Sequence, residues 1–128
     1  MRLKTAAFGL TTIPAYVAFA LFLSLIHALL EEYYWRAFVF AEMIRLVSTR
    51  PAIVASSIGF AAHHIVVLAV YFPDHFLSVV IPLSLAVAAG GVIWAWMYRR
   101  YASIYPGWLS HAFVDAGIMT VGGLIVWR

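Results

Sequence analysis

The chain contains four apolar runs, each long enough to cross a lipid bilayer, separated by short turns. A membrane-spanning helix needs about 20 predominantly apolar residues. Of the 128 residues, 66% are hydrophobic and only 10% are charged, whereas soluble domains carry about a quarter charged residues. We therefore expect an all-α, polytopic transmembrane four-helix bundle with spans at residues 6–46, 51–71, 76–98 and 105–127.

Prolines and glycines mark the ends and contacts of these spans. Pro14 either kinks the start of the first helix or marks its first turn, and Pro51 suits the first turn of the second helix. Gly90 and Gly91 lie inside the third span, where small residues permit close helix packing. With short turns and no linker, residues 1–128 are predicted to form a single transmembrane domain.

The positive charges are arranged as topology signals. Arg45, Arg50, Arg99 and Arg100 all fall on one side of a four-span protein, and the positive-inside rule places that side in the cytoplasm. Because the basic residues flank apolar runs and are not interleaved with exposed aromatic residues, we expect no nucleic-acid partner. The partner implied by the composition is membrane lipid.

Pairs of residues four apart place polar groups inside the apolar runs. The pairs are Glu32 with Arg36, Phe60 with His64, and His111 with Asp115. Residues at this spacing share one face of an α-helix. An ionised group at the bilayer centre costs about 2.5–3.5 kcal/mol, so these groups are expected to face one another inside the protein and to form a site.

Two kinds of chemistry suit a carboxylate with two imidazoles. Glu32, His64 and His111 form the donor set of a 2-His-1-carboxylate site for a divalent metal such as zinc. Without a metal, Glu31 or Glu32 would act as general base on a water, with the histidines orienting the water and stabilising an oxyanion. The chain has no cysteine, which excludes thiolate ligands and a cysteine nucleophile.

Structural explanations compete with these roles. Glu32 and Arg36 are also explained by an intrahelical ion pair that neutralises charge for membrane insertion. His63 points about 100° away from His64 on a helix and is interpreted as a packing histidine. His27 lies four residues before Glu31 and either joins the polar cluster or is satisfied in the core. The tryptophans, Trp94 included, are interpreted as interfacial belt residues.

The order of the motifs resembles the CPBP family of intramembrane proteases. The motifs are EExxxR, FxxxH and HxxxD on successive apolar helices, carried here by EEYYWR at 31–36, FAAHH at 60–64 and HAFVD at 111–115. The family comprises type II CAAX prenyl endopeptidases and bacteriocin-processing or immunity proteins, and is also called the Abi family. The resemblance covers residues 21–125.

The resemblance implies roles for the individual residues. Glu31, Glu32 and His64 would activate the attacking water, while His111 and Asp115 would stabilise the oxyanion. Arg36 would support the glutamates, and Phe60 marks the helix face with His63 beside it. Family members are described both as metalloproteases and as metal-independent glutamic proteases, so both a zinc-like metal and no cofactor are compatible with it.

This chain departs from the family pattern in three ways. Ala37 follows the motif arginine where glycine is usual, and Asp115 stands where asparagine is commoner. An ionised aspartate is a poor oxyanion donor. Relatives also carry further helices around the four-helix core, so this chain resembles a minimal member, a truncated remnant or half of a homo-oligomeric site.

The leading hypothesis is an intramembrane endopeptidase that hydrolyses a peptide bond of a membrane-associated or lipidated substrate. We place it as a multi-pass protein in the cell membrane of a prokaryote. One alternative is a non-catalytic immunity or scaffold protein in which the polar residues are helix–helix contacts. Another is an ion or proton pathway lined by the histidines and glutamates.

Overall fold

A computed structural model describes residues 9–127, and within this range all regular secondary structure is helical. Contacts divide the described residues into two compact units. Residues 9–31 and 108–127 form unit 1, and residues 32–107 form unit 2.

The first span is one continuous helix, Ile13–Leu46, of 34 residues. Its contour length of about 51 Å exceeds the roughly 30 Å hydrocarbon core of a bilayer. Two stretches within it are π-helical and flank the short α-helical turn that carries both glutamates. In chain order its segments are α2 (Ile13–Leu21), η1 (Phe22–His27), α3 (Ala28–Glu32), η2 (Tyr33–Phe40) and α4 (Ala41–Leu46).

The first helix begins later than the sequence predicted. Thr12 is extended and its hydroxyl accepts a hydrogen bond from the Ala15 amide at 3.4 Å, which caps the helix. Pro14 lies in the first turn, so it starts the helix and does not kink it. The predicted start at residue 6 is therefore wrong for residues 9–12, and residues 6–8 lie outside the described range.

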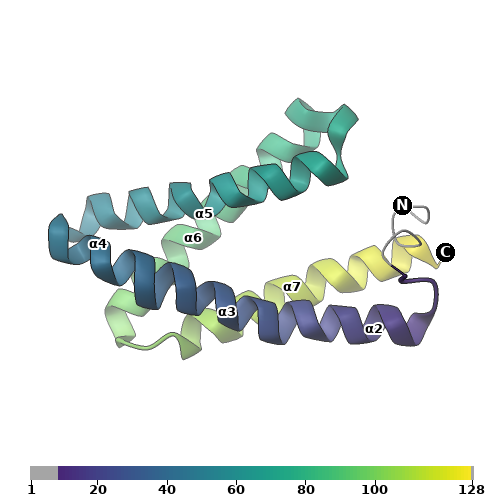
Figure 1. The fold of residues 1–128 in the computed structure, drawn as a ribbon, viewed down its shortest axis with the longest axis horizontal. Helices are drawn as coiled ribbons and strands as arrows, with labels where there is room; N and C mark the ends of the chain where they lie inside the picture. Colours follow the sequence, from purple (N-terminus) through teal and green to yellow (C-terminus); the bar gives the residue numbers. More distant parts are fainter. Residues whose placement is uncertain (1–8, 128) are drawn as a thin grey trace. The chain divides into compact units, whose positions relative to one another are not determined.

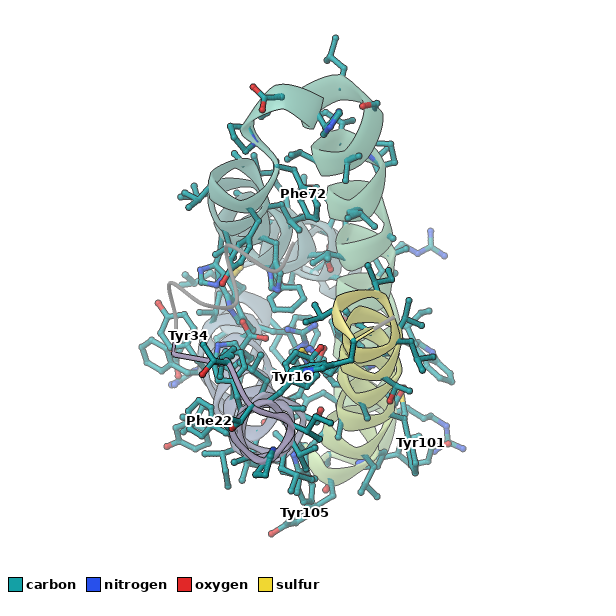
Figure 2. All side chains as sticks on the ribbon, turned by 90° about the vertical axis from the view of Figure 1, so that its right-hand side faces the viewer. Tyr16, Phe22, Tyr34, Phe72, Tyr101 and Tyr105 are labelled. Carbon is teal, nitrogen blue, oxygen red and sulfur yellow. The ribbon has the colours of Figure 1, made fainter. Side chains whose placement is uncertain are left out.

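In unit 1 the first helix packs against α7 (Tyr105–Val126) through Tyr16. Figure 1 shows α2 and α7 side by side, and in Figure 2 the Tyr16 side chain lies toward α7. The Tyr16 hydroxyl donates to the Met119 carbonyl at 2.7 Å. A Cβ at Gly122 would lie 2.8 Å from this hydroxyl and one at Gly123 would lie 3.1 Å from the ring, so both glycines permit the contact.

In unit 2, α5 (Thr49–Tyr71) packs along α6 (Ile81–Tyr101). The two are joined by η3 (Pro73–His75) and η4 (Phe76–Val80). Gly91 permits the close packing that the sequence predicted, because a Cβ there would lie 3.2 Å from the Ser57 Cβ. A small apolar core forms from Phe40, Ala52 and Ala95, which are all buried.

The prediction of an all-α protein with four membrane-spanning helices is confirmed in the described part of the chain. Four helices there are long and apolar enough to cross a membrane: Ile13–Leu46, Thr49–Tyr71, Pro73–Tyr101 and Tyr105–Val126. The third is three residues longer at each end than predicted and stops where Ala102 takes a left-handed φ of 50°. That all spans belong to one domain remains a prediction.

Several aromatic side chains are exposed on the surface of these helices. Tyr34, Tyr101 and Tyr105 are more than half exposed, and the side chains of Tyr101 and Tyr105 project outward in Figure 2. Amphipathic rings of this kind favour the interface between lipid and water. These tyrosines therefore have the exposure expected of residues in an interfacial belt.

Candidate active site

Both glutamates of the first motif lie on α3, the five-residue turn between the two π-helical segments. Both are buried, with exposed fractions of 8% for Glu31 and 0% for Glu32. Neighbouring helix residues point about 100° apart, so the two carboxylates enter different surroundings. Glu31 belongs to unit 1 and Glu32 to unit 2. Inserted π-helical turns occur frequently at functional sites.

In unit 1 the Glu31 carboxylate lies between two imidazoles. Its Oε2 is 3.6 Å from His111 Nε2 and 3.7 Å from His27 Nδ1. The same His111 nitrogen is 3.8 Å from Asp115 Oδ1. His111 is only 3% exposed, whereas the His27 side chain is 41% exposed. Two carboxylates and two imidazoles thus alternate in one cluster, which we call the Glu31 cluster.

In unit 2 the Glu32 carboxylate is held by Arg36, one turn further along the helix. Arg36 Nε is 3.3 Å from Glu32 Oε2, and both side chains are almost completely buried. The Arg36 guanidinium lies 4.6 Å from the Phe60 ring centroid and 5.4 Å from that of Trp94. It also donates from Nη2 to the Gly91 carbonyl at 3.5 Å. Cation–π contacts in a desolvated setting stabilise by up to about 2 kcal/mol.

The first turn of α7 reaches the same carboxylate. A Cβ added at Gly107 would lie 2.9 Å from Glu32 Oε2, which is closer than real Cβ atoms approach. A side chain at this position would therefore require the Glu32 carboxylate to shift. The start of α7 is also the positive end of its helix dipole, so Arg36 and the first turn of α7 both lie beside the Glu32 carboxylate.

Phe60 is fully buried and connects Arg36 with His64. Its ring is 4.5 Å from the His64 ring, and His64 Nδ1 is 3.0 Å from the Phe60 carbonyl oxygen. A carbonyl only accepts hydrogen bonds, so this geometry assigns the proton of neutral His64 to Nδ1. The Nε2 lone pair then remains as the acceptor, the form that suits a base or a metal ligand.

The structure therefore groups the predicted residues within each unit. Glu31, His111 and Asp115 come together in unit 1, while Glu32 and His64 are linked through Arg36 and Phe60 in unit 2. The exposed His63 is stacked edge-on against His64, with ring centroids 5.0 Å apart. That Glu32, His64 and His111 act together remains a prediction.

Three residues near these clusters were not among the predicted site residues. For His27 the sequence left open whether it joins the polar cluster or is satisfied in the core, and the structure places it in contact with Glu31. Trp94 was interpreted as a belt residue, which is wrong, because it is 6% exposed and packs on Arg36. Trp108 donates its indole N–H to the Leu25 carbonyl at 2.8 Å, and no sequence pattern indicated this bond.

An apolar groove of about 580 Å³ lies in unit 1 between the first helix and α7. Leu109, Ala112 and Ala116 line it, and they are neighbours in sequence of His111 and Asp115. Its remaining lining is almost entirely apolar, with hydroxyl groups from Tyr16, Ser24 and Thr120. The Glu31 cluster and the groove therefore share the same stretch of α7.

Comparison with known families agrees with these motifs. The family model described as type II CAAX prenyl endopeptidase Rce1-like matches residues 13–117, which is most of the chain. The chain belongs to the Rce1-like family. No curated protein and no solved structure gives a significant match. The resemblance to the CPBP proteases seen in the motifs is thereby confirmed.

As a member of the Rce1-like family with four apolar helices, the protein is an integral, multi-pass membrane protein of a protease family. Its substrates are accordingly membrane-associated. Carboxylate and imidazole side chains, the donor types that bind divalent cations such as zinc, are present in both units of this Rce1-like chain.

Proposed function

We propose that this Rce1-like protein is an intramembrane endopeptidase that hydrolyses a peptide bond of a membrane-associated or lipidated substrate. One observation carries the proposal: the buried Glu31 carboxylate lies 3.6 Å from the Nε2 of His111 within a membrane-spanning helix pair. A carboxylate next to an imidazole is suited to general acid–base catalysis. Placing an ionisable group inside a membrane costs free energy, and a catalytic role explains why Glu31 is buried there.

The two glutamates differ in their surroundings, which supports different roles. Glu32 lies beside Arg36 and the first turn of α7, so we assign Glu32 to holding the helix turn. The Glu31 carboxylate lies beside the imidazoles of His27 and His111. We therefore assign to Glu31 the removal of a proton from the attacking water.

The proposed reaction balances protons within the site. Glu31 takes a proton from water as the water oxygen attacks the peptide carbonyl carbon. It then gives that proton to the amide nitrogen as the C–N bond breaks, leaving a carboxylic acid and an amine. We assign His64 to the first step, because its Nε2 lone pair can accept a hydrogen bond from the water.

Stabilisation of the oxyanion is assigned to His111. This requires a hydrogen on Nε2, the nitrogen that lies 3.6 Å from Glu31 and 3.8 Å from Asp115. Two nearby carboxylates favour an N–H at this position. Because an ionised aspartate cannot donate to an oxyanion, we assign Asp115 to orienting His111 and not to direct donation.

A metal-dependent form of the same reaction is the alternative. A divalent metal such as zinc would take Glu32, His64 and His111 as ligands and would polarise both the water and the carbonyl when bound. The donor types fit such an ion. The close contact of Glu32 with Arg36 argues for the metal-independent form, because a metal would compete with the guanidinium for the same oxygen.

The apolar groove supports a substrate that is itself embedded in the membrane. It adjoins the Glu31 cluster on α7 and is lined almost wholly by apolar side chains. An apolar segment or lipid of the substrate lying there would bring the adjoining peptide bond toward His111. Pockets of this volume and composition are typical of ligand sites.

The test is cleavage of a membrane-tethered reporter peptide by the purified protein in liposomes. Glu31→Gln and His64→Ala are expected to lower turnover by about 10²–10⁴-fold, the usual contribution of acid–base groups. The matched controls are Glu42→Gln, an exposed acid on the same helix, and His75→Ala, an exposed turn histidine. Both controls should cleave normally.

The outcome distinguishes an enzyme from a scaffold. If the variants fold like the wild type by circular dichroism and lose cleavage, the catalytic assignment holds. Unchanged turnover in both Glu31→Gln and His64→Ala would refute it. Loss of folding or of self-association, with no cleavage by the wild type, would favour the non-catalytic membrane scaffold.

A further inference from the structure

Trp108 makes a hydrogen bond that joins α7 to the first helix near the Glu31 cluster. Its indole Nε1–H donates to the Leu25 carbonyl oxygen at 2.8 Å. The two residues are 83 positions apart in the sequence, so the bond is a tertiary contact. Trp108 lies three residues before His111 on α7, and Leu25 lies six residues before Glu31 on the first helix.

The π-helical segment gives this carbonyl its second partner. Leu25 lies in η1. Its carbonyl oxygen also accepts a hydrogen bond from the backbone N–H of Ala28, the residue that follows this segment. A carbonyl has two lone pairs, so it accepts both the amide and the indole. The bond therefore depends on the local backbone that precedes Glu31.

The two helices run in opposite directions in unit 1, so residues further along the first helix lie level with residues further back along α7. Glu31 lies six residues after Leu25, so its level partner would lie before Trp108. Glu31 instead contacts His111, three residues after Trp108. The Trp108–Leu25 and Glu31–His111 contacts therefore slant in opposite directions along α7.

Contacts that slant in opposite directions fix the position of one helix along another. A slide of α7 in either direction lengthens one of these contacts while it relaxes the other. The indole bond is the shorter and more directional of the two, with 2.8 Å between donor and acceptor against 3.6 Å for the Glu31–His111 contact. It therefore constrains the position of α7 more tightly than the Glu31–His111 contact does.

We propose that Trp108 is a positioning residue that sets the distance between Glu31 and His111 through its hydrogen bond to the Leu25 carbonyl. The effect on catalysis rests on the proposed endopeptidase function, whereas the effect on helix position does not. A misplacement of catalytic groups by about 1 Å costs up to roughly 10²-fold in rate. Removal of one N–H is therefore expected to affect turnover more than substrate binding.

The experiment uses Trp108→Phe, which keeps an aromatic ring and removes the donor. Trp96→Phe is the matched control, because Trp96 is 53% exposed on α6. Helix position is measured by electron–electron spin resonance between labels on cysteines introduced at the exposed Leu21 and Ile118. The chain has no native cysteine to interfere.

Trp108→Phe should broaden or shift the distance distribution between the two labels and lower kcat about 10-fold or more, with KM nearly unchanged. Trp96→Phe should leave both unchanged. If Trp108→Phe fails to fold, replacement of Trp108 by 3-benzothienylalanine, which has the same shape without the N–H, takes its place.

Each result decides the proposal. An unchanged distance distribution refutes the positioning role, whatever the activity. A changed distribution with unchanged kcat refutes the catalytic consequence. If the wild type cleaves no reporter, the failure belongs to the proposed function, and the distance measurement still decides whether Trp108 positions α7.

Discussion

Replacement of Arg36 by methionine tests how much the buried ion pair contributes to stability. Arg36 is 2% exposed and Glu32 is fully buried, so Arg36→Met leaves an uncompensated carboxylate in the protein interior. Breaking a buried pair from one side costs about 3–5 kcal/mol. Loss of the contacts with the Phe60 and Trp94 rings adds about 0.5–2 kcal/mol, so a loss of roughly 4–7 kcal/mol is expected.

The measurement is reversible unfolding in mixed micelles with increasing sodium dodecyl sulfate, followed by far-ultraviolet circular dichroism. A second substitution, Glu32→Gln, made in the Arg36→Met background, should recover much of the loss because it removes the buried charge. The control is Arg45→Met, since Arg45 pairs with Glu42 at an exposed site. Such surface pairs contribute about 0–1 kcal/mol.

Two results would refute this reasoning. If Arg36→Met is as stable as Arg45→Met, the buried pair contributes no more than a surface pair. Alternatively, the double variant could be less stable than Arg36→Met alone. Glu32 would then contribute through contacts other than its charge.

Three further predictions follow from close contacts and from the donor set. Gly107→Ala should destabilise the protein and reduce cleavage, because its Cβ would lie 2.9 Å from Glu32 Oε2. The control is Gly117→Ala, whose Cβ would have no atom within 4 Å and which should be neutral or stabilising in the same unfolding assay. Tyr16→Phe should cost about 1 kcal/mol through the lost bond to the Met119 carbonyl, and an unchanged midpoint would contradict this. Treatment with a strong chelator should leave cleavage intact in the metal-independent form, and loss that zinc restores would establish the metal-dependent form.

The spans were predictable because membrane insertion imposes a composition that is visible residue by residue. The start of the first helix was not, since the apolar run extends beyond the capping residue Thr12 and masks the boundary at Ile13. The sequence was compatible with Pro14 either kinking the helix or lying in its first turn, and the observed cap at Thr12 shows that it lies in the first turn. Helix ends depend on local backbone geometry, which composition does not record.

The site was predictable where helical spacing places groups on one face. Glu32 with Arg36 and His111 with Asp115 are in contact as their spacing of four suggested. Contacts between helices were not predictable in this way. Trp94 looked like a belt residue because tryptophans favour interfaces, yet the buried Arg36 provides it with a partner inside the protein.

In the proposed reaction Glu31 directs a water molecule to a peptide bond. Cleavage of the tethered reporter in water enriched in oxygen-18, with the new C-terminus analysed by mass spectrometry, measures this step. We expect the wild type to incorporate one oxygen-18 atom into the new carboxyl group and folded Glu31→Gln to form labelled product about 10²–10⁴-fold more slowly. Labelled product formed by Glu31→Gln at the wild-type rate would contradict this expectation.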